Sequence, residues 1–211
     1  MRPQRLLLDP ERPDPDGLRR AVEVLAAGEV LAFPTDTLYG LAVDPRRRDA
    51  ARRLFEVKRR PAGLAVPLIA ADAAQVDLIA RRVTPLARQL AAGWWPGPVS
   101  IVLDASAALD PALLTEAGTV AVRVPAHPLA RRLAAEFEHP ITATSANLSG
   151  EPPAADAASV AAGFGPELAV VVDGGPAPGG APSTIVDARG GTPVLVREGS
   201  VQWDRVLQSL A

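Results

Sequence analysis

Short apolar runs alternate with amphipathic helical stretches along nearly the whole chain, and this alternation limits the possible folds most strongly. The predicted strands cover 6–8, 30–33, 66–69, 99–103, 120–124, 141–143, 169–172, 184–186 and 194–196. The predicted helices cover the stretch from Asp14-Pro15 to Gly28, and 49–57, 73–82, 85–92, 128–137, 156–162 and 202–210. Such a pattern predicts a mixed α/β fold, α+β-like in detail, in which helices flank one large twisted mixed sheet. Because the turns are short and no low-complexity linker interrupts the pattern, we expect a single domain over 1–211.

The residue types of the chain exclude several kinds of chemistry. There is no cysteine, which excludes disulfides, thiolate metal ligands and cysteine nucleophiles together. The sequence contains neither GxxxxGK[ST] nor a GxGxxG after a strand, so these nucleotide-binding loops are not supported. The two histidines, His127 and His139, each adjoin a proline and lack ligand spacing, so no zinc site is expected and His127 is predicted to be structural.

Net charge and hydropathy bear on nucleic-acid binding and on cellular location. The formal net charge of −2 gives no overall basic signal for nucleic acid, so binding of RNA would need a local patch. No apolar run reaches the ~18 residues of a membrane span, and the first residues lack the apolar core of a signal peptide. We therefore expect a cytoplasmic protein with no membrane contact.

Polar clusters follow the apolar runs, and the first two lie at 34–40 and 58–61. The first, PTDTLYG, places hydroxyls and a carboxylate directly after a strand, where open α/β sheets bind ligands. The second, KRRP, ends a helix, where cations are favoured by the helix dipole alone. The dipole does not explain why Lys58 is the single lysine among 22 basic residues, since Lys and Arg are exchangeable on a solvated surface.

Two further polar clusters lie at 118–125 and 142–150. Arg123 stands inside an apolar strand, where an unpaired guanidinium would be costly. It needs an anionic partner, either an Asp or Glu of the chain or a substrate carboxylate. The stretch TATSANLSG is dense in short hydrogen-bonding side chains, which suit a phosphate or sugar and equally suit a helix cap. The glycine- and proline-rich segment 174–182 is either a plain surface loop or an active-site lid.

Six of these stretches occur in the order and spacing of the YrdC-type proteins, which the chain resembles from about 21 to 199. They are FPTDTLYGLAVD, KRRP, WWPGPVSIVL, VAVRVPAHPLA, TSANLSG and VLVREG. The paired signature KxR and SxN, here Lys58/Arg60 and Ser145/Asn147, is the hallmark of that family. By its length the chain resembles the single-domain branch, without the extra C-terminal domain of the longer members.

The resemblance implies a fold and a reaction. It implies a YrdC-like fold with an open, positively charged concave cavity. It also implies an L-threonylcarbamoyladenylate synthase, a nucleotidyltransferase that converts ATP, L-threonine and bicarbonate into threonylcarbamoyl-AMP and pyrophosphate. This is the first step of N6-threonylcarbamoyladenosine formation in tRNA, and a downstream tRNA threonylcarbamoyl transferase complex would use the product. Mg²⁺ is expected to arrive with ATP, with no metal ligand from the protein.

The resemblance also assigns site residues. Lys58 and Arg60 are the expected catalytic residues. The expected ATP-binding residues are Lys58, Arg60, Thr119, Ser145, Asn147 and Arg197. The expected threonine-binding residues are Thr35, Thr37, Arg123, Ala143 and Ser183. Two positions depart from the family: Leu64 stands where many relatives have a polar or basic residue, and Asp36 stands where Glu is common.

Two other functions remain open from the sequence. Arginines at 46–48, 52–53 and 59–60 could extend a basic surface, which would suit a non-catalytic module that binds structured RNA, even weakly. A paralogue that binds a nucleotide without activating threonine is the second alternative.

Overall fold

The protein is described by a computed structural model over residues 3–61, 64–148, 150, 152 and 154–210. Its strands are β1 (Gln4–Leu7), β2 (Leu31–Pro34), β3 (Tyr39–Ala42), β4 (Leu68–Ile69), β5 (Val99–Asp104), β6 (Thr119–Arg123), β7 (Ile141–Thr142), β8 (Thr144–Ser145), β9 (Val170–Asp173), β10 (Thr184–Asp187) and β11 (Val194–Arg197). Its helices are α1 (Pro15–Ala26), α2 (Arg48–Lys58), α3 (Ala73–Val76), α4 (Pro85–Trp94), α5 (Pro128–Glu136), α6 (Ala157–Phe164) and α7 (Trp203–Gln208).

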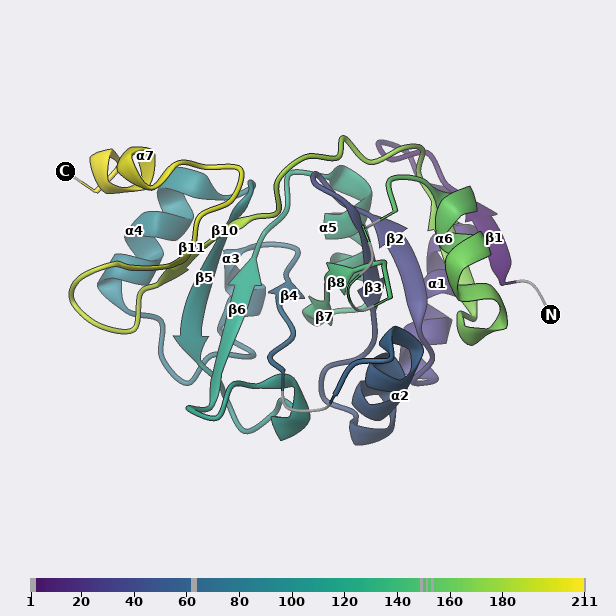
Figure 1. Ribbon diagram of the computed structural model, residues 1–211, viewed down its shortest axis with the longest axis horizontal. Helices are drawn as coiled ribbons and strands as arrows, with labels where there is room; N and C mark the ends of the chain where they lie inside the picture. Colours follow the sequence, from purple (N-terminus) through teal and green to yellow (C-terminus); the bar gives the residue numbers. More distant parts are fainter. Residues whose placement is uncertain (1–2, 62–63, 149, 151, 153, 211) are drawn as a thin grey trace.

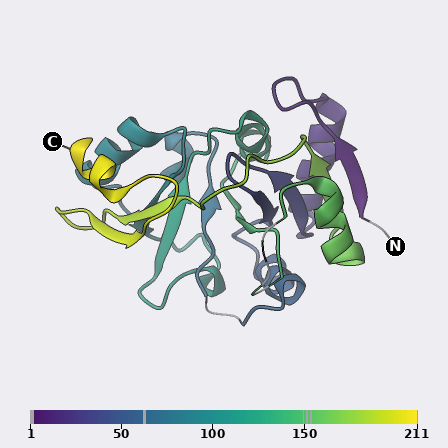
Figure 2. The same cartoon turned by 45° about the horizontal axis from the view of Figure 1, so that its top comes forward.

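The strands form two mixed sheets (Figure 1). The first has the order β1-β9-β2-β3-β8 and the second the order β11-β10-β5-β6-β4-β7. The mixed α/β class is therefore confirmed, although the strands expected in one large sheet are shared between two. The first sheet, with β1 at its edge, and the α4–α7 end of the second sheet lie at opposite ends of the long axis (Figures 1 and 2). Among the described residues, no helix is both long and apolar enough to cross a membrane.

The first sheet is buried on both faces by helices. In β2, Leu31 and Phe33 pack with α1 and α5, whereas Ala32 packs with α2 and α6 on the opposite face. This alternation follows from the two-residue period of a strand. Each fully buried Leu or Phe side chain contributes about 1.5–3 kcal/mol to folding. The nearly continuous apolar sequence of this strand therefore reflects burial on both sides.

The second sheet is buried on one face and carries polar groups on the other. Ile101 of β5 and Val120 and Val122 of β6 belong to the core beneath α3, α4 and α7. Since successive side chains of a strand point to opposite faces, Thr119 and Arg123 point away from this core. The strand pattern thus decides which side chains are free to build a site.

The helix starts that the sequence predicts are confirmed by their caps. Asp14 accepts a hydrogen bond from the backbone N–H of Gly17 at 2.9 Å, and Pro15 opens α1. Thr84 accepts one from the N–H of Ala87 at 3.0 Å at the start of α4. Such caps satisfy backbone N–H groups that have no partner within the helix.

Two predicted elements differ in the structure. The helix expected over 73–82 ends at Val76, because Ala80 forms an antiparallel bridge with Ala105 beyond β5. The polar stretch 34–40 contains the expected turn at 35–38, but this turn joins β2 to β3, a strand that was not predicted. Tyr39 is fully buried there, and its hydroxyl donates to the carbonyl of Gly175 at 2.7 Å.

Candidate functional site

A cavity of about 620 Å³ is lined by residues of both sheets. Its walls come from the β2–β3 hairpin, from β4, β5 and β6, from β7–β8, and from β10 and β11. The predicted site residues that line it are Thr35, Thr37, Arg60, Thr119, Arg123, Ala143, Ser145, Ser183 and Arg197. Residues that lie up to 162 positions apart in the numbering, from Thr35 to Arg197, therefore share one space. Lys58 and Asn147 are not among the residues that line it.

Arg123 forms a buried polar corner with the hairpin that follows β2. Its guanidinium is 6% exposed and forms an ion pair with Asp36 at 2.5 Å. The other guanidinium nitrogen lies 3.3 Å from the hydroxyl of Thr37 and 3.4 Å from that of Thr35. The backbone N–H of Ala126 also donates to Asp36, at 3.1 Å. Of the two partners that the sequence left open, the structure shows the internal carboxylate, which keeps the guanidinium fixed at the cavity wall.

Lys58 ties the two halves of the KxR/SxN signature together. Its ammonium donates to the backbone carbonyls of Ser145 and Asn147, the latter at 3.0 Å. The residue is 4% exposed at the last position of α2. Its contact atoms are backbone oxygens, so the lysine fixes the path of the 145–147 segment whatever ligand enters the cavity.

Arg60 reaches the cavity because α2 ends abruptly. Arg59 has a left-handed φ of 49°, and the N–H of Arg60 donates to the carbonyl of Phe55 at 3.0 Å. This left-handed cap turns the chain out of the helix directly after Lys58. Burial lowers the pKa of Arg60, and the guanidinium remains a cation at the cavity wall.

The electrostatics of Lys58 give the first testable prediction. Burial, and then the nearby charge of Arg60, lower its pKa from 10.5 to about 8. Because Lys58 is the only lysine, lysine labelled with ¹³C at Cε gives one signal to follow against pH by NMR. We expect its titration midpoint near pH 8, and the Arg60→Gln variant should raise that midpoint by removing the like charge. A midpoint at or above 10 would show that the ammonium is not desolvated.

Ser145 and Asn147 are also joined through their side chains. The hydroxyl of Ser145 donates to Oδ1 of Asn147 at 2.5 Å, and Nδ2 of Asn147 donates to the carbonyl of Leu148 at 2.9 Å. The pairing of Ser145 with Gly40 joins this segment to β3. The SxN half of the signature is thus held by β3 on one side and by Lys58 on the other.

The opposite wall of the cavity is built by the β10–β11 hairpin. Arg197 donates to the carbonyl of Ser183 at 2.8 Å, and burial lowers its pKa. The hydroxyl of Ser183 shares a hydrogen bond with that of Ser100 at 2.9 Å. Ser100 was missed by the sequence reasoning, although a serine inside the apolar run VSIVL was the available signal.

Two further polar residues of the wall, Thr115 and Arg189, were also not predicted. The hydroxyls of Thr119 and Thr115 share a hydrogen bond at 2.7 Å, and both residues line the cavity. Arg189 lines it as well, paired with Asp187 at 2.8 Å and with Asp104 at 3.5 Å. In the part of the chain that the structure describes, no three His, Asp or Glu side chains form a group suited to a metal ion.

Three positions singled out in the sequence lie near the cavity without forming its charged wall. Leu64 is 48% exposed and does not line the cavity, whereas the next residue, Ala65, does. His127 stands at the N-cap position of α5 without a side-chain cap hydrogen bond; burial lowers its pKa, and within the described structure its Nδ1 has no hydrogen-bond partner. The segment 174–182 is fastened beside the cavity, since the N–H of Gly179 donates to the carbonyl of Thr37 at 2.8 Å.

Comparison with protein families and curated proteins finds close matches over most of the chain. The family model Sua5_yciO_yrdC, described as "Telomere recombination", matches residues 23–199. A threonylcarbamoyl-AMP synthase of Pyrococcus abyssi is 36% identical over 189 residues, which are 90% of this chain and 56% of that protein. A threonylcarbamoyl-AMP synthase of Vibrio vulnificus is 38% identical over 186 residues, 86% of this chain and 98% of that protein. The chain thus spans about half the length of the Pyrococcus relative and nearly all of the Vibrio one.

Solved structures show the same similarity. P. abyssi Sua5 complexed with L-threonine superposes with a TM-score of 0.92 and 34% identity, covering 98% of this chain and 60% of that one. E. coli YciO superposes with a TM-score of 0.86 and 26% identity, covering 95% and 97%. The chain therefore shares the overall fold of these proteins.

Proposed function

The chain belongs to the Sua5/YciO/YrdC family, and from this premise we propose that it makes threonylcarbamoyl-AMP and pyrophosphate from ATP, L-threonine and bicarbonate. The observation that carries the proposal is the sharing of one cavity by the Arg123 corner and the cationic walls at Arg60 and Arg197. A site of this kind can hold a carboxylate at one end and a polyphosphate at the other. The names of the Pyrococcus and Vibrio relatives, and the threonine complex of P. abyssi Sua5, support the same assignment.

The reaction needs little proton chemistry from the protein. The amine of threonine and bicarbonate combine to a carbamate with loss of water. The carbamate oxygen then attacks the α-phosphorus of ATP, the bond to the bridging oxygen breaks, and pyrophosphate leaves. Because the nucleophile is already an anion, the main obstacle is charge repulsion between it and the triphosphate. Catalysis by positioning and charge neutralisation suits a cavity whose described lining has four arginine side chains and no histidine.

On the ATP side, we assign Arg60 and Arg197 to the phosphates and Thr119 and Ser145 to the nucleoside, with Asn147 orienting the hydroxyl of Ser145 through their hydrogen bond. Lys58 would support them by holding the backbone of the SxN segment and by adding positive charge near the cavity. Mg²⁺ would enter with the triphosphate and share in neutralising it. Because the AMP group of ATP passes to the carbamate oxygen, the reaction would be that of a nucleotidyltransferase.

On the threonine side, we assign the carboxylate of the substrate to Arg123. Thr35 and Thr37 offer hydroxyls beside the same guanidinium, and the amide groups around Ala143 lie along the adjoining wall. Ser183 lines this space directly before β10 and is oriented by its hydrogen bond with Ser100.

Release of pyrophosphate tests this function. We expect release from ATP only when both L-threonine and bicarbonate are present, with loss of activity when either is omitted. ATP breakdown that does not depend on threonine would instead support a nucleotide-binding paralogue. We further propose that a separate transferase, acting with the protein in the cytoplasm, passes the threonylcarbamoyl group to the adenosine beside the anticodon of tRNA.

Binding of RNA is a second candidate function, because arginines gather on α2 next to the cavity. Arg48, Arg52 and Arg59 line a separate hollow of about 440 Å³ together with Arg60, which also reaches the main cavity. Each of the first three has a carboxylate nearby. Arg48 lies 3.8 Å from Asp110, Arg52 lies 3.6 Å from Glu56, and Arg59 lies 4.0 Å from Glu167. The three guanidinium side chains are themselves exposed, so these long contacts are weak and leave positive charge available to a phosphate backbone beside Glu56 and Asp110, which also line the hollow.

The RNA hypothesis predicts binding that weakens steeply with salt. For tRNA titrated between 50 and 200 mM salt, removing charges in Arg48→Gln/Arg52→Gln should lower the slope of log affinity against log salt by about one to two. Pyrophosphate release should stay unchanged in this variant, since neither residue lines the main cavity. Binding that is equal in the variant and the parent would remove α2 as the contact surface.

A further inference from the structure

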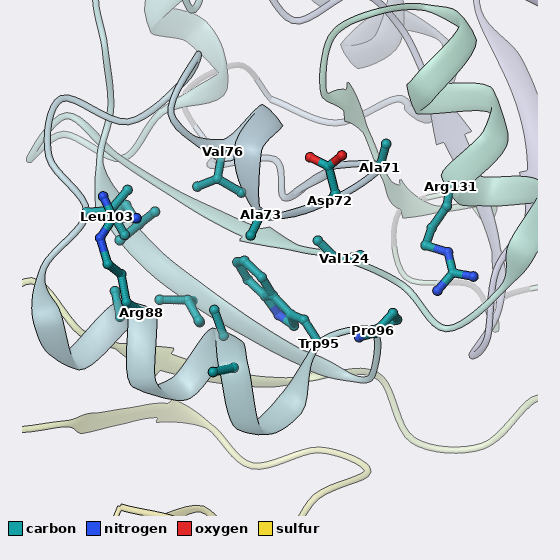
Figure 3. Close-up of a pocket in the computed structure, with 15 residues that line it drawn as sticks. Ala71, Asp72, Ala73, Val76, Arg88, Trp95, Pro96, Leu103, Val124 and Arg131 are labelled. Atoms are coloured by element: carbon teal, nitrogen blue, oxygen red, sulfur yellow. The ribbon is translucent and has the colours of Figure 1, made fainter.

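A second cavity lies on the opposite face of β5 from the main one. Its volume is about 460 Å³, and Ile101, Leu103 and Val124 line it (Figure 3). The alternate residues Ser100 and Val102 of β5 line the main cavity instead. The two-residue period of the strands therefore gives this sheet one cavity on each face.

The body of the second cavity is apolar. Val76 of α3 and the small side chains of Ala87 and Ala91 on α4 form its sides. Alanines at these positions leave room that larger side chains would fill. Trp95 rises into the cavity, as Figure 3 shows, and its indole N–H already donates to the carbonyl of Val99 at 2.7 Å. A bound molecule would therefore meet only the apolar surface of this indole.

Charged side chains stand at the edges of this apolar space. Arg131 of α5 extends toward Pro96 at one end, and Arg88 lies at the other (Figure 3). Arg88 is partnered by Asp77 at 3.7 Å, whereas within the described ranges no carboxylate lies within ion-pair distance of Arg131. The carboxylate of Asp72, also at the edge, is engaged in capping α3.

We propose that this second cavity binds a small molecule with an aromatic or branched apolar body and a single carboxylate, which pairs with Arg131. Among the described residues, Arg131 is the cation at this apolar pocket without a carboxylate partner, so burial of the body would supply affinity and this guanidinium would fix the orientation. The observations that carry it do not involve the main cavity, so it stands apart from the proposed synthesis of threonylcarbamoyl-AMP. The site is a separate binding site on the back of the sheet that carries Arg123.

Two probes of equal shape and different charge test the proposal. Naphthalene-2-carboxylate and naphthalene-2-carboxamide are titrated into the full chain by calorimetry. We expect saturable binding of one carboxylate per chain, about tenfold tighter than the amide. Arg131→Gln should remove this preference and leave the amide affinity unchanged. The matched control, Arg132→Gln, alters the adjacent exposed residue of the same helix, which does not line the cavity, and should keep the preference.

A cavity-filling variant tests whether the apolar part of the ligand binds beside α4. Ala91→Phe places a ring in the space between α4 and Trp95 and should weaken both probes at least tenfold, with an unfolding temperature close to that of the parent. Pyrophosphate release in the absence of probe should be unchanged in Arg131→Gln. The proposal is overturned if the carboxylate shows no saturable binding, if Arg131→Gln and Arg132→Gln behave alike, or if folded Ala91→Phe binds both probes normally.

Discussion

Replacing Lys58 by Arg should reduce pyrophosphate formation by about 10²–10³-fold while the protein remains folded. The ammonium sits in a site that is 4% exposed and donates to two backbone carbonyls, those of Ser145 and Asn147. A guanidinium is larger and planar, so it cannot make the same two contacts without moving the segment that carries them. The displaced segment would no longer present Ser145 to the nucleotide. Steady-state release of pyrophosphate, with circular dichroism of the folded state, measures the effect.

A swap between the same residue types elsewhere on α2 serves as the control. Arg52→Lys changes an exposed side chain that does not line the main cavity, and it should leave turnover within about twofold of the parent. Near-normal turnover in Lys58→Arg would show that any cation suffices at the end of α2. In that case the helix dipole, rather than the SxN segment, would account for the lysine.

Replacing Arg123 by Ala should raise the concentration of threonine needed for half-maximal rate by about 10- to 150-fold. This range corresponds to about 1.5–3 kcal/mol for a hydrogen-bonded charged contact. The concentration of ATP needed should change by less than about threefold, because the assigned phosphate contacts lie on other elements of the wall. Removing the guanidinium also leaves Asp36 unpaired in a poorly exposed place, which destabilises the fold. Arg123→Ala is therefore compared with Arg123→Ala/Asp36→Asn, in which both charges are removed, and the threonine effect should persist.

Arg197 provides the reciprocal test on the opposite wall of the cavity. Arg197→Ala should raise the ATP requirement more than the threonine requirement, the reverse of Arg123→Ala. Initial rates over a grid of both substrate concentrations separate the two effects. Equal effects on both substrates in Arg123→Ala would remove its assignment to the carboxylate of threonine.

The sequence predicts most of the secondary structure because its periodicities are strong. β2 is apolar at every position, and α1 and α4 carry caps at Asp14 and Thr84 that fix their first turns. The division of the strands into two sheets was not predictable, because an apolar run does not show which other strands it pairs with. The short helix α3 was overestimated for a similar reason: the bridge from Ala80 to Ala105 is a long-range contact that local propensity cannot contain.

The sequence identified many of the residues that line the candidate cavity but not their contacts. Thr35, Arg60, Thr119, Arg123 and Arg197 meet at one cavity, as the resemblance of motifs implied. What the motifs could not show is that Lys58 contacts backbone carbonyls, because carbonyl positions leave no mark in a sequence. Ser100 was missed because a single serine in an apolar strand is usually a tolerated core residue. The second cavity is lined mostly by Ala and Val, so no sequence motif indicates it.

The identity of the product tests the proposed function most directly. The purified protein is incubated with ATP, Mg²⁺, L-threonine and ¹³C-labelled bicarbonate, and the nucleotides are analysed by mass spectrometry. We expect an adenylate that contains threonine and carries one ¹³C atom, formed in an amount equal to that of pyrophosphate. In Lys58→Arg, formation of this adenylate should be greatly reduced. Formation of ADP or AMP without a threonine-containing adenylate, in protein that is folded and binds ATP, would contradict the proposed function.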